Sequence, residues 1–373
     1  MRFPSQSYIR RSTTRYTFVG RKVILEPEVS DFISPSFAWT VDGEEVECDK
    51  QKFEFTPLAS GNYIISVAVS ETSDIAAVPC RMSRNLFRSS SSSARAFVEV
   101  VCVDGSETDL RRYPGAGASA YSDKVYEWIP APGQFINLAT MGGAELSHES
   151  ACVWAQNRLD AGIDVSLGAF GGYIVVGFDH SIVASAGYDF AIVGNAFVGE
   201  NGAQCSNEPG VVWVMQDVNG NGLPDDEWYE LKGSEYDMES TVHGYAVTYY
   251  RPEASGMDVR WSDNIGNSGT IDYLAAFHNQ PYYYPMWIDS GSYTLSGTSL
   301  KARNYFDTAI GVWTTLPYGW GYADNVGSDA ITGVQGQQTG FKISNAVFAD
   351  GTPIDLQYID FIKVQGAVQA KSG

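Results

Sequence analysis

The chain has little positive charge, few histidines and no long hydrophobic run. Its 373 residues include 24 Lys and Arg against 44 Asp and Glu, which gives a net charge of −20. This balance argues against nucleic acid as a partner, because binding the phosphate backbone requires a basic face. No run of about 18 apolar residues occurs, so no segment is predicted to span a membrane. The four histidines are too few to favour metal or acid–base catalysis.

Cysteine is also scarce, and its pattern is not that of a metal site. Five cysteines are widely scattered, with no Cys-x-x-Cys or His/Cys cluster, so zinc is not predicted. The odd number leaves at least one thiol unpaired within the chain. No Gly-x-Ser-x-Gly or P-loop motif occurs, and we therefore do not predict an enzyme. A signal-peptide hydrophobic segment is missing as well, and because the chain opens abruptly with Met-Arg-Phe we expect that an export signal has been removed from it.

Glycine and tyrosine are abundant instead, with 38 and 22 copies, while 18% of the residues are charged. Aromatic and β-branched residues suit pleated strands and glycine suits turns, so an all-β protein is predicted. The length predicts two domains. Residues 15–103 are expected to form an immunoglobulin-like β-sandwich, because short alternating segments are separated by turns. Its expected strands cover residues 16–19, 23–25, 37–41, 52–56, 63–69 and 96–101.

Residues 104–122 are predicted to be a linker, because this stretch has low hydrophobicity and contains a Gly/Ala/Ser run. Residues 123–373 are expected to form a larger jelly-roll-type β-sandwich with one helix and a ligand site. Ser147 is placed to cap this helix, apolar residues recur on one face, and Gly162 ends it. The expected strands cover residues 172–178, 188–193, 211–215, 245–250, 341–344 and 358–364.

The most specific local pattern lies at residues 217–230. Oxygen-bearing side chains fall at alternate positions, Asp217, Asn219 and Asn221, and a glycine follows, which matches the start of a calcium loop. The pattern departs from an EF-hand at the twelfth position, where Trp228 replaces a glutamate. Bound Ca²⁺ is predicted here, and an Asn/Gly turn between two strands is the alternative. The candidate ligands are Asp217, Asn219, Asn221, Leu223, Asp225, Asp226 and Glu230.

Two loops of the second domain resemble each other, since both place Asp-Asn before an aliphatic residue, a glycine and a serine. Turn formation is the simpler role of such residues. Aromatic residues crowd the same part of the sequence, and consecutive aromatics in a strand point to both faces, so some are expected outside the core. A large aromatic core is the alternative. Together these features predict a ligand site made of Asp263, Asn264, Tyr283, Trp287, Trp320, Tyr322, Asp324 and Asn325.

Segments of both predicted domains resemble a known family. Trp39 with the following Asp42 and Gly43, and the stretch from Gly61 to Val67, are similar to PKD-like modules. Much of the second domain resembles PKD-like-domain cell-surface proteins of gut Gram-negative bacteria. The matching segments are residues 177–182, 187–197, 208–217, 228–235, 246–252, 301–305, 341–346 and 358–364.

This resemblance implies a spacer followed by a β-sandwich binding domain in a lipoprotein of the outer surface, attached to the outer membrane through an N-terminal anchor that this chain lacks. Family members often occur beside cobalamin-uptake components, which implies capture of a corrinoid or a related nutrient. We therefore expect a non-enzymatic, calcium-stabilised cell-surface protein that binds a small molecule or a glycan. Adhesion or assembly with another surface protein is the second hypothesis, and a glycan-active enzyme is the third.

Overall fold

The computed structural model describes residues 1–5, 7–30, 32–72, 91–138, 140, 145–200, 204–331 and 337–370. The chain divides into two compact units. The first contains Met1–Leu110, Val218–Asn221 and Asp225–Glu227, and the second contains Arg111–Asp217, Gly222–Pro224 and Trp228–Gly373. Strands dominate both units, so the all-β prediction is confirmed.

The first unit is built from seven described strands and a short 3-10 helix. A five-stranded sheet has the order β1-β7-β6-β3-β4, and β2 pairs with β5 in a second, two-stranded sheet. The long pair β6–β7 is antiparallel, whereas β1 runs parallel to β7. The elements are β1 (Arg15–Phe18), β2 (Val23–Leu25), β3 (Ser36–Val41), β4 (Glu44–Val46), β5 (Phe53–Phe55), β6 (Gly61–Thr72), β7 (Ser91–Val103) and η1 (Glu107–Asp109).

Trp39 on β3 organises the core of this unit. Its side chain is 1% exposed and its ring stacks on Phe53 at 5.0 Å between centroids. The indole N–H donates to the carbonyl of Lys50 at 2.8 Å, so the polar atom of this large ring is satisfied. After β3, Asp42 and Gly43 have positive φ angles of 51° and 88°, which form the tight turn into β4.

The second unit contains four described sheets. A six-stranded sheet has the order β21-β12-β11-β22-β9-β8, and the others are β15-β14-β13-β16, β10-β20-β19 and β17-β18. The elements are β8 (Lys124–Ile129), α1 (His148–Asp160), β9 (Tyr173–Val183), β10 (Phe190–Gly194), β11 (Gly210–Met215), β12 (Tyr229–Leu231), β13 (Val242–Tyr250), β14 (Val259–Asp263), β15 (Ser268–Ile271), β16 (Ser292–Ser299), β17 (Asn304–Asp307), β18 (Val312–Thr315), β19 (Ala330–Ile331), β20 (Gln337–Phe341), η3 (Ile343–Asn345), β21 (Ala346–Val347) and β22 (Tyr358–Gly366).

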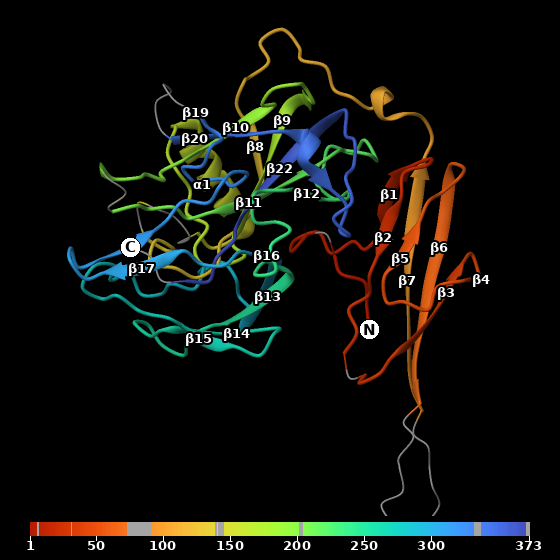
Figure 1. The fold of residues 1–373 in the computed structure, drawn as a ribbon, viewed down its shortest axis with the longest axis horizontal. Coiled ribbons are helices and arrows are strands. Elements are labelled where there is room, and N and C mark those ends of the chain that lie inside the picture. Colours follow the sequence, from red (N-terminus) through yellow and green to blue (C-terminus); the bar gives the residue numbers. More distant parts are fainter. Residues whose placement is uncertain are drawn as a thin grey trace, which may run out of the picture. The chain divides into compact units, whose positions relative to one another are not determined.

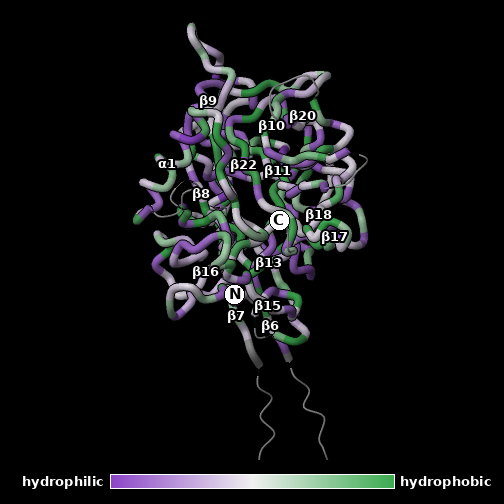
Figure 2. Tube along the Cα trace, turned by 90° about the vertical axis from the view of Figure 1, so that its left-hand side faces the viewer, coloured by the Kyte–Doolittle hydropathy of each residue, from purple (hydrophilic) through white to green (hydrophobic). Residues whose placement is uncertain are grey.

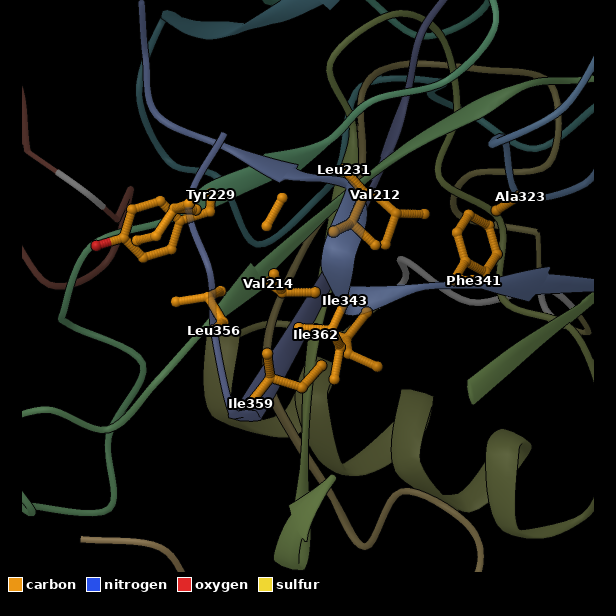
Figure 3. Packing of buried hydrophobic residues seen from close by; sticks show 12 residues of the cluster. Val212, Val214, Tyr229, Leu231, Ala323, Phe341, Ile343, Leu356, Ile359 and Ile362 are labelled. Atoms are coloured by element: carbon orange, nitrogen blue, oxygen red, sulfur yellow. The ribbon is translucent and has the colours of Figure 1, made fainter. Parts of the chain in front are cut away.

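Strand β22 lies at the centre of the six-stranded sheet, between β11 and β9 (Figure 1). Its first five residues, Tyr358 to Ile362, are all buried, so both faces of the strand are covered. The hydropathy colouring of Figure 2 follows the same pattern, with hydrophobic residues along β22 and β11. In Figure 3, Val214, Ile343 and Ile359 lie close together with other apolar side chains. Burial of this apolar area is the main source of stability for such a layer.

The predicted helix is present, and among the described residues α1 is the one α-helix. Ser147 caps it as expected, since its hydroxyl accepts the N–H of Ser150 at 3.2 Å. Trp154 on the helix stacks on Trp128 of β8 at 5.1 Å between centroids. No helix among the described residues has the length and hydrophobicity needed to cross a membrane.

The strand predicted at residues 341–344 is wrong beyond Phe341. The chain turns there into η3, because the N–H of Ile343 donates to the Oδ2 of Asp189 at 2.7 Å instead of to a neighbouring strand. Of the cysteines, Cys48, Cys102, Cys152 and Cys205 are thiols, and Cys80 lies outside the described residues.

Candidate functional site

A cavity of about 280 Å³ lies in the second unit, beside the ends of β12 and β20. We call it the β12–β20 pocket. The lining combines aromatic, charged and glycine residues from segments far apart in the sequence. The lining residues are Tyr188, Leu231, Lys232, Trp320, Gly321, Ser328, Asp329, Gly340, Phe341, Lys342 and Asn345.

The hydrophobic core extends to the lining of this pocket. Leu231 and Phe341 are each 2% exposed, and both belong to the cluster of buried side chains around β11 and β22. The N–H of Lys232 donates to the carbonyl of Asn345 at 3.0 Å, which joins the end of β12 to η3. These contacts fix the end of β12 and the segment that follows β20.

Trp320 is held by its backbone rather than by burial of its ring. Its carbonyl accepts the N–H of Ser234 at 2.9 Å, while the indole side chain remains partly open and the residue is 39% exposed. The next residue, Gly321, has a φ of +86°, and a Cβ there would lie 2.5 Å from the Cα of Gly233. Only glycine fits this close approach, so the two glycines allow the backbone beside Trp320 to pack closely on residue 233.

Tyr188 presents a second partly exposed ring, with 48% of the residue accessible. The ring covers Gly340 of β20, where an added Cβ would meet ring atoms at 2.5 Å. A side chain at position 340 would therefore displace the tyrosine. The Nζ of Lys342 lies 5.8 Å from the centre of the same ring, so the aromatic and cationic groups share one part of the lining.

The charged groups of the pocket differ in their partners. Asp329 is 5% exposed, and its Oδ2 accepts the N–H of Gly321 at 2.6 Å. Its Oδ1 is buried with no hydrogen-bond partner among the described residues, and burial raises the pKa of Asp329. Lys232 pairs with Asp237 at 3.0 Å, whereas Lys342 forms no ion pair within the described part of the chain.

Of the eight predicted ligand-binding residues, Trp320 lines the pocket. Tyr322 is 2% exposed, and its hydroxyl accepts the N–H of Glu235 at 2.9 Å. The side-chain oxygen of Asn325 accepts the N–H of Tyr318 at 2.7 Å, deep inside the fold. Both residues fix the loop that carries Trp320.

Asp324 also holds the backbone in place through hydrogen bonds. Its Oδ1 accepts the N–H groups of Asn195 and Ala196 at 2.8 and 2.7 Å. Burial, together with the negative charge of Glu208, raises the pKa of Asp324 to about 7.

The other Asp-Asn pair belongs to the hairpin between β14 and β15. Asp263 accepts hydrogen bonds from the Tyr245 hydroxyl at 2.7 Å and from the N–H of Asn267 at 2.6 Å. Although burial works in the opposite direction, these hydrogen bonds hold the pKa of Asp263 below its usual range. Asn264 accepts the N–H of Ala246 at 3.0 Å and donates to the Gly244 carbonyl at 2.9 Å.

The two remaining predicted ligand-binding residues, Tyr283 and Trp287, are buried. Tyr283 is 1% exposed, and its hydroxyl donates to the His278 carbonyl at 2.8 Å. Trp287 is 7% exposed and its ring contacts that of His148 at 5.5 Å between centroids. The structure therefore places these aromatics in the core and does not bring them to the lining of the β12–β20 pocket.

Sequence reasoning missed most of the pocket. Tyr188 appeared there only as the start of an expected strand, and no local motif marks the remaining polar groups. They come from separate segments that the sheet order brings together, and adjacency in the sequence gives no signal of it. The missed polar and aromatic lining residues are Tyr188, Lys232, Ser328, Asp329, Lys342 and Asn345.

The calcium-like loop connects β11 to β12, as both interpretations of the sequence require. Asp217 is 5% exposed, its N–H donates to Asp360 at 2.8 Å, and its Oδ2 accepts the N–H of Gly222 at 2.9 Å. The side-chain amides of Asn219 and Asn221 both donate to Asp225, at 3.0 and 3.1 Å. The loop therefore brings two of its predicted ligands, Asn219 and Asn221, to the carboxylate of a third, Asp225.

The remaining candidate ligands occupy different surroundings. Asp226 accepts the N–H of Val218 at 2.8 Å, and Leu223 follows the turn at Gly222. Glu230 lies on β12, where its carboxylate accepts the hydroxyl of Thr298 at 2.5 Å. Burial raises the pKa of Glu230 to about 7.

Acidic side chains alone do not complete a metal shell here. Across the described ranges, no group of three or more His, Cys, Asp or Glu side chains is placed to hold a metal ion. The donor chemistry of carboxylate and amide oxygens fits a hard cation such as Ca²⁺, and amide and backbone oxygens would supply the rest of the shell.

Comparisons with known proteins give weak likenesses. No protein-family model matches the chain, and no curated protein matches it in sequence. A quinonprotein alcohol dehydrogenase-like protein from Bacteroides thetaiotaomicron is 11% identical, covers 73% of this chain and has a TM-score of 0.17. The chain spans 50% of the length of that protein.

Two further solved structures match over nearly the whole chain. One concerns carbohydrate-binding modules from the β-sandwich superfamily, with 8% identity, coverage of 96% of this chain and 94% of that chain, and a TM-score of 0.17. The other is SGBP-B of the mixed-linkage glucan utilization locus of Bacteroides ovatus in complex with a heptasaccharide, with 10% identity, coverage of 97% of both chains and a TM-score of 0.17. Scores this low do not establish a shared fold.

Proposed function

We propose that the second unit is a carbohydrate-binding unit and that the β12–β20 pocket holds the sugar. The observation that supports this is the pairing of two partly exposed rings, Trp320 and Tyr188, with the polar groups of Lys232, Asp329 and Asn345 in one lining. A sugar ring has apolar C–H faces and hydroxyl edges. It is therefore complementary to an aromatic ring with hydrogen-bonding groups beside it.

The size of the cavity favours a glycan over a corrinoid. A volume of about 280 Å³ lies just below the usual range for ligand pockets, which is about 300–1,000 Å³. One or two sugar rings fit such a space, whereas a corrinoid macrocycle needs a much larger one. Between the two ligands that the sequence predicts, we therefore propose the glycan.

We propose binding without catalysis. Most glycoside hydrolases use two carboxyl groups across the scissile bond, one as the acid and one as the base or nucleophile. Among the described lining residues, Asp329 is the single carboxylic acid. A site with one carboxylate and two lysines suits recognition of a ligand better than this reaction.

Titration calorimetry against a panel of oligosaccharides and against cobalamin tests the proposal. Replacing Tyr188 or Trp320 by Ala should weaken sugar binding about fivefold or more, since truncating a side chain that is important for binding costs more than about 1 kcal/mol. Tyr305→Ala is the matched control, because Tyr305 is 43% exposed and lies on β17 outside the pocket. Sugar binding that survives both pocket variants unchanged, or binding of cobalamin alone, contradicts the proposal.

We also propose that residues 217–230 bind Ca²⁺. The support is the gathering of Asn219 and Asn221 on Asp225. Their oxygens would hold the ion, which would tie the two ends of the loop together when bound.

We also propose that the protein lies on the cell surface. This proposal rests on the resemblance of segments between residues 177 and 364 to cell-surface proteins of gut Gram-negative bacteria. Antibody labelling and protease treatment of intact cells test it, since a surface protein is labelled and cleaved before the cells are lysed. Labelling that requires lysis would place the protein inside.

A further inference from the structure

The lining of the β12–β20 pocket holds two lysines and one carboxylic acid, although the protein as a whole is acidic. The lysines are Lys232 and Lys342, and the acid is Asp329. The whole chain has a net charge of −20. Cationic side chains in a concave site attract an anionic ligand at short range, although the negative charge of the whole chain works against its approach from a distance.

Lys342 is the more available of the two cations. In the part of the chain that the structure describes, no carboxylate lies within ion-pair distance of it, and its Nζ is 5.8 Å from the centre of the Tyr188 ring. The carboxylate of the neighbouring Asp189 is held by the backbone instead, because its oxygens accept the N–H groups of Ser185 and Ile343 at 2.6 and 2.7 Å. Lys342 can therefore bind a negative group of the ligand.

Lys232 forms an ion pair with Asp237, but an anion of the ligand can take the place of this carboxylate. Asp237 contacts the lysine at 3.0 Å and has a side chain that is 79% exposed. Ion pairs with such an exposed partner are weak, so a ligand anion can replace Asp237 at little cost. The next acidic residue along the chain, Glu235, already pairs with Arg303 at 3.0 Å.

Asp329 repels an anionic ligand less strongly than a fully ionised, unpaired carboxylate would. Its Oδ2 accepts the N–H of Gly321 at 2.6 Å, so part of the charge is compensated. Burial also raises the pKa of Asp329, which favours the neutral acid. The lysines therefore remain the groups of the lining that can attract an anion.

We infer that the sugar taken by the β12–β20 pocket is acidic, a uronic acid unit whose carboxylate contacts Lys342 and Lys232 while its ring lies against Trp320 or Tyr188. This inference rests on the proposed carbohydrate-binding function and adds the chemical class of the sugar. A uronate combines the two features that the lining offers to match, an apolar ring face and one negative charge.

The test compares acidic oligosaccharides with their own methyl esters. Galacturonate, glucuronate and mannuronate trisaccharides are titrated into the full chain, each as the free acid and as the neutral ester. The ester keeps the sugar skeleton and removes the charge. For the sugar that binds, we expect the acid to bind about two- to fivefold more tightly than the ester for each lysine contact, the gain typical of a partly exposed ion pair.

Three variants assign this preference to Lys342. Lys342→Gln should reduce the preference for the acid about two- to fivefold, and Lys342→Arg should retain it, since arginine keeps the charge. Lys124→Gln is the matched control: Lys124 lies 4.3 Å from the centre of the Tyr126 ring, outside the pocket, and should change nothing. Thermal melting of each variant confirms that it is folded.

Failure of this inference can be told apart from failure of the proposed function. Equal binding of acid and ester, or binding of neutral oligosaccharides alone, overturns the acidic class while the carbohydrate site stands. A preference for the acid that persists in Lys342→Gln overturns the assigned contact. If no acidic or neutral sugar binds at all, both proposals fall.

Discussion

At the scale of single residues, Asp324 combines a positive φ angle with a buried carboxyl group. Its backbone has a positive φ of 52°, its Oδ1 holds two backbone N–H groups, and burial raises its pKa from 3.8 to about 7. Because the folded state binds this proton more tightly than the unfolded state, the carboxyl stabilises the fold most below pH 4. That contribution declines as the pH rises to about 7 and stays lost above it.

We expect Asp324→Asn to remove this pH dependence. Asparagine keeps the acceptor oxygen and tolerates a positive φ, but it cannot ionise. At pH 8 the variant should have a free energy of unfolding about 1–2 kcal/mol above that of the natural chain. A shift of one pKa unit corresponds to ~1.4 kcal/mol, and solvent screening reduces the effect of the whole shift. At pH 4 the two should agree.

Urea denaturation at both pH values measures this difference. Asp307→Asn is a suitable control, because Asp307 also accepts a backbone N–H, that of Ala309, at 2.9 Å in a turn. Equal pH dependence of the natural chain and the Asp324 variant would show that the buried carboxyl does not ionise differently in the folded state.

The same residues show the limit of local sequence patterns. Asp263, Asn264, Asp324 and Asn325 stand out in the sequence because their side chains hydrogen-bond well at turns, and in the structure all four bond to backbone groups. The capacity that fixes a turn is also the capacity that binds a ligand. A sequence pattern alone therefore cannot separate the two roles.

At the scale of elements, the loop from β11 to β12 carries the clearest prediction about metal. The structure gathers two asparagine amides on Asp225, so a cation that replaced these N–H donors would meet oxygens already close together. Millimolar CaCl₂ should raise the melting temperature, and a chelator should reverse the rise. The gain is about 2.7 kcal/mol when free Ca²⁺ reaches a hundred times its dissociation constant.

Asp225→Asn should abolish this response to calcium, because it removes the charge on which the loop converges. Asp237→Asn serves as the control, since Asp237 is an exposed carboxylate outside the loop. Differential scanning calorimetry with and without the chelator gives the measurement. Identical melting curves in both conditions, with no calcium binding by titration, would leave the segment as an Asn/Gly turn.

Elements were predictable where local physics decides them. The apolar run at residues 358–364 identified β22, and Ser147 with Gly162 identified the ends of α1, because burial and capping depend on nearby residues. Strands β4, β8 and β14 to β19 were not foreseen, and neither was the change from β20 to η3. This change depends on Asp189, which is more than 150 residues away from Ile343 in the sequence.

At the scale of the whole molecule, β12 lies next to both proposed sites. It follows the calcium-like loop directly, and Leu231 and Lys232 at its end line the β12–β20 pocket. The strand is also held on both sides, since Val214 of β11 pairs with Tyr229 and Ala346 of β21 pairs with Leu231. Its position is therefore fixed by the sheet, whatever the state of the loop.

We therefore expect the two sites to act independently. Sugar affinity measured with calcium and with a chelator should agree within about twofold, because coupling between sites requires an element with two arrangements that both ligands bias. Coupling is reciprocal, so calcium affinity should also be unchanged at saturating sugar. A shift of fivefold or more in both titrations would mean that β12 moves with the loop. A shift in one titration alone would point to a direct effect of calcium on the sugar.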